Sequence, residues 1–286
     1  ADNNTAIGHK ALNLNTTGTN NTAVGKDAGA ALTTATYSTF IGSFAGDSTT
    51  TGTYNTVVGS AAFADNTTGA NNTVLGTSAL ADNTTASNNT AIGFEAMRLN
   101  TTGANNTAIG GGAMGANTEG GTNVAVGQSA LSSNTTASNN TAMGYNALGA
   151  NTTGAQNVAV GRLALDANTT AADNTAIGNA AMTASTTGAN NTSVGSGSMR
   201  ANTTGAGGVA IGKDTLDSNT TGTRNTAVGQ DALGGNTTGG DNVAIGNSAL
   251  ESNTTASNNV AIGRVALNAN TTGAGNSAVG DGAGDN

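Results

Sequence analysis

Apolar and polar residues alternate along the chain in a pattern that repeats every seventeen residues. With repeat positions numbered from 1 at Asn4, the consensus is N-T-A-[IV]-G-x-x-A-[LM]-x-x-N-T-T-G-x-N, and no insertion or deletion interrupts it. Position 4 is always Ile, Val, Leu or Met, position 8 is mostly Ala, and position 9 is mostly Leu, Met or Phe. Such fixed-period self-similarity is typical of a repeat protein in which each unit packs on its neighbours.

The pattern predicts two short extended segments and two turns in each repeat. Positions 2–4 are expected to form a strand, with Thr or Val at 2 and the aliphatic residue at 4 facing inward and Ala at 3 facing the other way. Positions 8–11 are expected to form a second extended segment with Leu inward at 9. Asn-Thr-Thr-Gly at 12–15 and the Asn pair at 17 and 1 are typical of turns.

A glycine follows the aliphatic residue of position 4 in every repeat. We expect it to end the strand with a positive φ, which a residue with a Cβ adopts only at a cost. These turn glycines are Gly8, Gly25, Gly42, Gly59, Gly76, Gly93, Gly110, Gly127, Gly144, Gly161, Gly178, Gly195, Gly212, Gly229, Gly246, Gly263 and Gly280.

Together these elements predict an all-β fold, a parallel β-solenoid (β-roll) of about seventeen 17-residue rungs. Asn, Thr and Gly are poor helix formers, and helical repeats need roughly 30 residues or more, so a helical solenoid is disfavoured. Residues 1–286 are expected to be a single uninterrupted repeat array and a segment of a longer chain. The small Ala at positions 3 and 8 suggests close approach of another surface, so we expect a homotrimer packed through these small faces.

Composition excludes a large globular interior, because 36% of the residues are hydrophobic, 2% are aromatic, and Trp, Cys and Pro are absent. Eight Lys and Arg against sixteen Asp and Glu give a net charge of −8, which argues against nucleic-acid partners. No apolar stretch in this segment is long enough to span a membrane. Charges fall at positions 6, 7, 10, 11 and 17, apart from Asp2 and Glu119, and mark the expected solvent side.

The stretch from Thr102 to Met114, T-G-A-N-N-T-A-I-G-G-G-A-M, resembles the T-G-x-N-S-V-A-I-G-x-x-A repeat in the heads of trimeric autotransporter adhesins. The whole unit is similar to the 17-residue arrays of bacterial tail-fibre-domain proteins. The resemblance implies a left-handed parallel β-roll assembled as a trimer on a cell surface or a phage-like fibre. It matches Asn105 to the turn Asn of the head motif, Thr107 and Ile109 to its inward pair, and Gly110 to its turn Gly. The present unit is longer than the usual adhesin-head rung.

The sequence contains few residues that could carry out catalysis. His9 is the only histidine, and it lies at a variable position on the solvent side. The acidic residues are scattered singly, and the G-G-x-G-x-D pattern of calcium-binding solenoids is missing. We therefore expect no enzyme activity, no metal site and no cofactor.

Asparagines followed by Thr two residues later recur at position 12 and, in seven repeats, at position 17. They are candidate glycosylation sites. Alternatively they are turn residues whose stacked side chains form hydrogen-bonded ladders, or the Asn-Thr-Thr column orders water as an ice-binding surface. The position-12 sequons are Asn15, Asn66, Asn83, Asn100, Asn134, Asn151, Asn168, Asn202, Asn219, Asn236, Asn253 and Asn270.

Aromatic residues cluster in repeats 2 to 4, where Gly29 and Gly46 replace the apolar residue of position 9. One interpretation is local repacking, in which Phe40 or Phe44 fills the vacated volume. The other is a ligand-contact patch of exposed rings. The candidate ligand patch consists of Tyr37, Phe40, Phe44 and Tyr54.

These features favour the structural rod of an extracellular fibre or surface adhesin, similar to a tail fibre, that supplies length and repeated weak contacts. The alternatives are an ice-binding β-solenoid that uses the Asn-Thr-Thr column and a glycan-decorated filament subunit. Expected partners are further copies of the chain, in a homotrimer or filament, and a surface glycan or matrix receptor. The expected location is extracellular or at a cell or virion surface.

Overall fold

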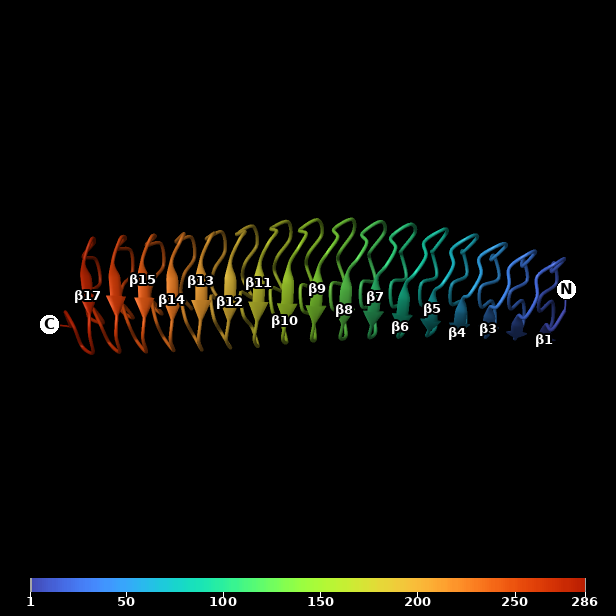
Figure 1. The fold of residues 1–286 in the computed structure, drawn as a ribbon, viewed down its shortest axis with the longest axis horizontal. Helices are drawn as coiled ribbons and strands as arrows, with labels where there is room; N and C mark the ends of the chain where they lie inside the picture. The colour runs from blue at the N-terminus through green and yellow to red at the C-terminus, as the bar shows by residue number, and fades with distance from the viewer. Residues whose placement is uncertain (1, 286) are drawn as a thin grey trace. The chain divides into compact units, whose positions relative to one another are not determined.

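The computed structural model describes residues 2–285 as an all-β parallel β-solenoid of about sixteen turns, and none of these residues lies in a helix. The chain forms two compact units, Ala1–Asn140 and Thr141–Asn286. Each unit is a stack of coils that contribute one three-residue strand apiece (Figure 1).

The strands of the first unit are β1 (Thr5–Ile7), β2 (Thr22–Val24), β3 (Thr39–Ile41), β4 (Thr56–Val58), β5 (Thr73–Leu75), β6 (Thr90–Ile92), β7 (Thr107–Ile109) and β8 (Val124–Val126). Those of the second unit are β9 (Thr141–Met143), β10 (Val158–Val160), β11 (Thr175–Ile177), β12 (Thr192–Val194), β13 (Val209–Ile211), β14 (Thr226–Val228), β15 (Val243–Ile245), β16 (Val260–Ile262) and β17 (Ser277–Val279). Within each unit, consecutive strands pair in parallel with residue i opposite residue i + 17, as in Thr90 with Thr107.

Hydrogen bonds between coils continue outside the strands. The amide of Leu80 donates to the carbonyl of Ala96 at 2.9 Å, and that of Thr84 donates to Thr101 at 3.1 Å. In the opposite direction, the amide of Asn88 donates to Ala70 at 3.1 Å. Because unpaired backbone groups are costly to bury, this ladder around the coil lets a thin chain form a stable stack.

The strand alternates as predicted, but its phase is opposite to the prediction. The middle residue at position 3 is buried in every strand from β2 to β16, whereas positions 2 and 4 face outward and are exposed or partly exposed. The matches of Thr107 and Ile109 to an inward pair are therefore wrong within the coil. The prediction failed because it assigned the largest apolar side chain to the inside, whereas the narrow coil holds the small side chain of Ala there in most repeats.

The predicted second extended segment at positions 8–11 is also wrong. This part of the coil is a run of turns, with left-handed backbone at positions 7 and 9, for example at Glu95 and Met97. Ala96 and Met97 are both fully buried although they are neighbours in the chain. An extended strand would point them to opposite sides, so the turn run is what places both side chains inside.

The interior of a coil is consequently filled by Ala at positions 3 and 8 and by Leu or Met at position 9, as at Ala142, Ala147 and Leu148. The burial of positions 8 and 9 agrees with the sequence prediction. The two alanines are buried inside their own coil. They therefore cannot form the small faces through which we expected copies of the chain to pack.

The glycine of position 5 closes each strand with φ between +128° and +148°. A Cβ built on Gly110 would lie 2.6 Å from the carbonyl carbon of Gly127 in the next coil, closer than real Cβ contacts come. Both the backbone conformation and the tight coil spacing therefore require glycine here.

We predict that Ala176→Asp destabilises the second unit by several kcal/mol, because it places an unpaired charge in the shared interior. Ile177→Asp, one residue later, is expected to cost far less, since the Ile177 side chain is 40% exposed on the outer face. Thermal unfolding in dilute solution, with the exposed Asn179→Asp as control, measures both effects. Equal losses for Ala176→Asp and Ile177→Asp would contradict the observed strand phase.

Candidate functional site

In most coils, two buried asparagines hold the same backbone carbonyl and so close the coil. In one coil, Nδ2 of Asn106 at position 1 and Nδ2 of Asn117 at position 12 both donate to the carbonyl of Gly120, each at 2.9 Å. In another, Asn225 and Asn236 hold Gly239 at 2.7 and 3.0 Å. Because position 15 follows both asparagines in the chain, the two hydrogen bonds pin its turn to the coil interior.

The same asparagines also link each coil to the next. Oδ1 of Asn89 accepts the backbone N–H of Asn106 at 2.9 Å. Along position 12, Nδ2 of Asn117 donates to Oδ1 of Asn100 at 2.7 Å, and Nδ2 of Asn134 donates to Oδ1 of Asn117 at 2.8 Å. The amides of this ladder all point in one direction, an arrangement in which hydrogen bonds polarise one another.

The ladder of position 12 is broken in the second unit at Ser185. The serine side chain is too short to continue the ladder, and its buried Oγ has no hydrogen-bond partner. Oδ1 of Asn168 in the preceding coil is also buried without a partner. This break makes Ser185 a defect in the polar interior of its coil.

The candidate glycosylation sites of position 12 therefore lie inside the coil. Ten of the twelve are buried, and Asn15 and Asn270 are partly buried. Their amide nitrogens are used in the ladder and the turn, as described for Asn117 and Asn134. A sugar cannot be attached to them in the folded chain without breaking these contacts. Of the interpretations considered for this column, the geometry fits the hydrogen-bonded ladder.

The sequence carries a signal for this burial that our interpretation as surface turns overlooked. Position 12 accepts Leu at Leu32, and positions 1, 5, 12 and 13 never carry a charge. Leu32 is fully buried. Position 12 is Asn in most repeats and is replaced once each by Leu, Thr and Ser. A position that accepts Leu is expected in an interior rather than in a solvated turn.

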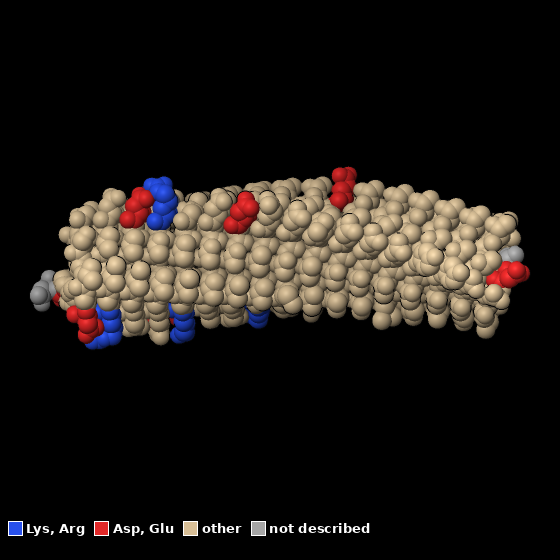
Figure 2. Space-filling view, in the orientation of Figure 1, with Lys and Arg blue, Asp and Glu red and all other residues tan. Residues whose placement is uncertain are grey.

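The outward residues of positions 2 and 4 form an uncharged face on each unit, called here the sheet face. Ile41, Ile177, Ile211 and Ile245 are 39–42% exposed in it. Thr or Val accompanies them at position 2. In Figure 2 the charged side chains lie along the edges of the face drawn, and the band between them carries none. Position 4 supplies most of the large hydrophobic side chains that are exposed in the described residues.

The candidate ligand patch does not come together as a patch. Phe40 is fully buried at position 3, and a Cβ on Gly29 would lie 3.2 Å from its ring. The glycines at position 9 thus make room for Phe40, which corrects its assignment as a ligand contact and confirms local repacking. Tyr37 and Tyr54 lie at position 17, exposed and stacked with ring centroids 5.3 Å apart.

Phe44, the fourth member of the candidate patch, lies at position 7 and is 38% exposed. The ammonium group of Lys26 lies 4.8 Å from the centroid of its ring. This cation–π contact joins neighbouring coils on a different part of the coil from the tyrosine pair.

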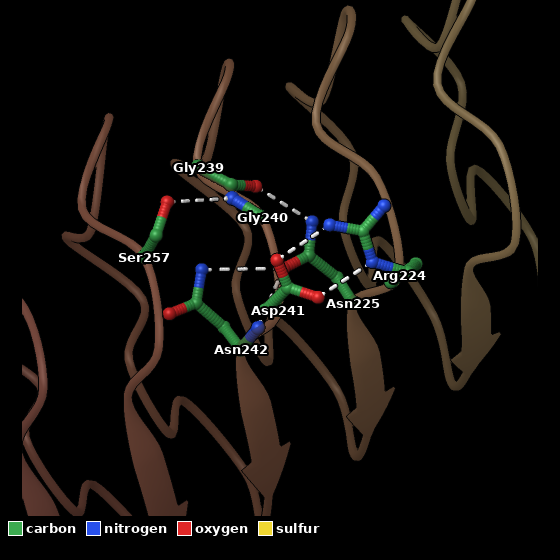
Figure 3. Close-up of polar contacts among 7 residues, drawn as sticks. All are labelled: Arg224, Asn225, Gly239, Gly240, Asp241, Asn242 and Ser257. Atoms are coloured by element: carbon green, nitrogen blue, oxygen red, sulfur yellow. Dashed lines mark hydrogen bonds and ion pairs between the residues drawn. The ribbon is translucent and has the colours of Figure 1, made fainter.

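Ion pairs link position-matched residues of neighbouring coils in the second unit. Nε and Nη2 of Arg224 donate to the two carboxylate oxygens of Asp241 at 2.6 and 2.7 Å (Figure 3). This bidentate contact lowers the pKa of Asp241 and raises that of Arg224. Arg200 donates a single hydrogen bond from Nη2 to Oδ2 of Asp217 at 2.8 Å. Because the Arg224–Asp241 pair is exposed, it contributes little to stability.

An acidic groove in the second unit is lined by Asp214, Asp217, Asp231 and Glu251. The described residues contain no group of three or more His, Cys, Asp or Glu arranged to hold a metal ion. Within residues 2–285 there is also no helix long and apolar enough to cross a membrane. His9 lies at the surface, 3.8 Å from Asp27.

Burial raises the pKa of several aspartates at positions 10 and 11. Desolvation is the main cause for Asp47, Asp82, Asp166 and Asp217. Oδ1 of Asp47 is buried without a hydrogen-bond partner, which leaves its charge poorly compensated. These carboxylates therefore bind protons more readily in the folded chain than in the unfolded chain.

Comparisons with known proteins add no relative. No protein-family model matches the chain, and a search of curated proteins gives no match either.

We predict that Ser185→Asn stabilises the second unit by about 1–2 kcal/mol, because the new amide satisfies Oδ1 of Asn168 and restores the ladder. Denaturant unfolding measures the gain. Ser196→Asn is the matched control, since Ser196 is exposed and its substitution adds no interior contact. A loss of stability on Ser185→Asn would show that the ladder does not stabilise the coil.

Stability is predicted to fall as pH rises above the ordinary aspartate pKa of 3.8. Between the ordinary aspartate pKa of 3.8 and the raised values, the folded chain binds more protons than the unfolded chain, so folding is favoured at the acidic end and loses free energy as these groups ionise. Asp47→Asn and Asp166→Asn should each flatten the dependence of melting temperature on pH. Ser196→Asn, at an exposed site without a carboxylate, should leave this dependence unchanged. A melting temperature that rises with pH would contradict this assignment.

Proposed function

We propose that the chain is a structural element of an extracellular fibre or surface adhesin, in which copies associate through their sheet faces and present repeated weak binding contacts. The observation that carries this proposal is the row of exposed aliphatic side chains at position 4, which repeats coil by coil in each unit. The role requires length, a uniform surface and a resistant fold, and it requires no catalysis.

The apolar area supports association with a partner. The exposed parts of positions 2 and 4 amount to on the order of 500 Å² in each unit, the size of the largest apolar patches that monomers leave open. Specific interfaces bury about 800 Å² per partner, so the sheet face of one unit would supply more than half of that area. An uncharged apolar stripe of this size favours burial against a second surface.

A second copy of the chain is the partner that fits best. A contact made at one coil recurs at every coil only if the partner has the same rise per repeat, and an identical chain has it by construction. Cyclic assembly closes on itself and avoids open growth. The proposed assembly is therefore a homotrimer with the sheet faces toward a common axis, or a filament built through the same face.

Such an assembly would leave the turns at positions 14 and 17 on the outside, where Thr and Asn recur from coil to coil. Many equivalent contacts multiply avidity even when each is feeble. A surface glycan or a matrix receptor with repeating polar groups is the kind of partner that this exterior suits. The corresponding location is outside the cell or at a cell or virion surface.

Ice binding is the second candidate function. The hydrogen bonds of position 13 favour the sheet face over the Asn-Thr-Thr column as the ice-binding surface. The hydroxyl of Thr101 at position 13 donates to the carbonyl of Thr118 in the next coil at 3.0 Å, and Thr118 does the same to Thr135 at 3.1 Å. The Asn-Thr-Thr column thus leaves only position 14 free, as at Thr136. The sheet face, with regular Thr and aliphatic columns and no charge, is the better ice-binding surface.

We predict that the purified chain forms a closed oligomer and that Ile177→Asp combined with Ile211→Asp dissociates it, because two charges per copy would enter the apolar interface. Light scattering after gel filtration measures the mass. Asn179→Asp combined with Asn247→Asp adds the same charge at exposed positions outside the sheet face and should leave the oligomer intact.

A parent chain that stays monomeric at all concentrations would contradict the fibre proposal. If that monomer also shapes ice crystals, and Ile177→Asp with Ile211→Asp abolishes the shaping without unfolding it, the ice-binding candidate takes its place.

A further inference from the structure

The chain contains two classes of Asn-x-Thr sequon that the fold treats in opposite ways. At position 12 the asparagine is interior and its amide is hydrogen-bonded, as at Asn66 and Asn83. At position 17, Asn71, Asn88 and Asn105 are exposed, and their side chains form no hydrogen bond with any residue from 2 to 285. The asparagine of the same tripeptide pattern is therefore accessible to solvent at position 17 and buried at position 12.

Neighbouring residues at positions 17 and 1 point in opposite directions, which explains the difference within the Asn-Asn pair. In Figure 3 the Asp241 side chain turns outward to Arg224, whereas Asn242 next to it donates to Oδ1 of Asn225 in the coil interior at 3.2 Å. Asn105 and Asn106 repeat this geometry. Asn105 is exposed, and Asn106 is buried and bonded to Gly120.

Position 17 also has room for large groups. It holds the stacked rings of Tyr37 and Tyr54, which are 56% and 57% exposed, and the Arg224 guanidinium. Its backbone is left-handed, with φ of 58° to 62° at Asn71, Asn88 and Asn105. Asn tolerates this conformation, which accounts for the residue type.

The conformation of the turn does not, however, explain why Thr follows two residues later, at position 2. Position 2 is Val instead of Thr at Val124, Val158, Val209, Val243 and Val260, so the fold accepts either residue. Asn258 is exposed in the same column and is followed by Val260. The fold thus contains exposed asparagines with and without the hydroxyl that completes a sequon.

We propose that the position-17 asparagines Asn71, Asn88, Asn105 and Asn190 are glycosyl acceptor sites of the folded chain, and that the position-12 asparagines are not. In the transfer from a nucleoside diphosphate sugar, the amide Nδ2 forms a bond with the anomeric carbon. The bond from that carbon to the diphosphate oxygen breaks, the nucleoside diphosphate leaves, and the amide gives up one proton to a base of the transferase. In the first unit, the sugars on Asn71, Asn88 and Asn105 would form a column along one edge of its sheet face.

This inference rests on the orientation of side chains within a coil and not on assembly of copies. A chain that proves monomeric would contradict the fibre proposal and leave the acceptor sites unchanged. Conversely, a fibre without acceptors at position 17 would contradict only the present inference.

The test incubates the folded chain with uridine diphosphate glucose and a soluble asparagine glycosyltransferase, and maps the added hexose by mass spectrometry. Synthetic peptides covering residues 64–70 and 103–109 establish beforehand that the transferase accepts both sequon classes when unfolded. In the folded chain we expect hexose at Asn71, Asn88, Asn105 and Asn190 and at least tenfold less at Asn66, Asn83 and Asn100.

Two exchanges between residues that the fold already uses at position 2 provide matched controls. Thr107→Val should abolish modification at Asn105, and Val260→Thr should create it at Asn258, both without a change in melting temperature beyond a few degrees. Equal modification of the two columns in the folded chain, or no modification of position 17 by a transferase that modifies both peptides, would overturn the proposal.

Discussion

Each coil must return to the same place after seventeen residues, and in most coils the buried asparagines at positions 1 and 12 impose that closure. Both donate to the carbonyl of position 15, as Asn106 and Asn117 do to Gly120, and both bond to a neighbouring coil. An amide buried without partners would cost several kcal/mol, so these contacts have to be satisfied together. The polar groups therefore take a share of the interior that a globular protein would give to aliphatic side chains.

The distribution of the remaining residues follows from this constraint. With two amides inside a narrow coil, positions 3 and 8 hold small residues in most coils, chiefly Ala, and a single Leu or Met usually fills the rest at position 9. The exchange of Ala for Phe40 succeeds because Gly29 and Gly46 vacate the adjacent space. The aliphatic residue of position 4 is left to face outward, as at Ile177, and gives the sheet face its apolar character. The packing of the coil interior thus determines which apolar side chains face outward and are available for association.

Periodicity alone was sufficient to predict the β-solenoid, the strand at positions 2–4 and the burial of positions 8 and 9. The phase of the strand was not predictable by ranking side chains by size, because Ile109 is more apolar than Ala108 and yet faces outward. The turn run at positions 6–11 depends on left-handed backbone at residues such as Leu80, which propensity disfavours and packing enforces. Burial of the asparagines was signalled by Leu32, a substitution that a solvated turn would not favour. The sheet face became recognisable only once the phase was known.

The closure by buried asparagines is tested most directly by hydrogen exchange of asparagine side-chain amides, followed by nuclear magnetic resonance in the folded chain. Amides at positions 1 and 12, such as those of Asn106 and Asn117, are predicted to exchange far more slowly than those at position 17, such as Asn105. Protection should be lost locally at the ladder break beside Ser185. Uniformly rapid exchange of all asparagine amides in a chain whose backbone amides remain protected would contradict the account.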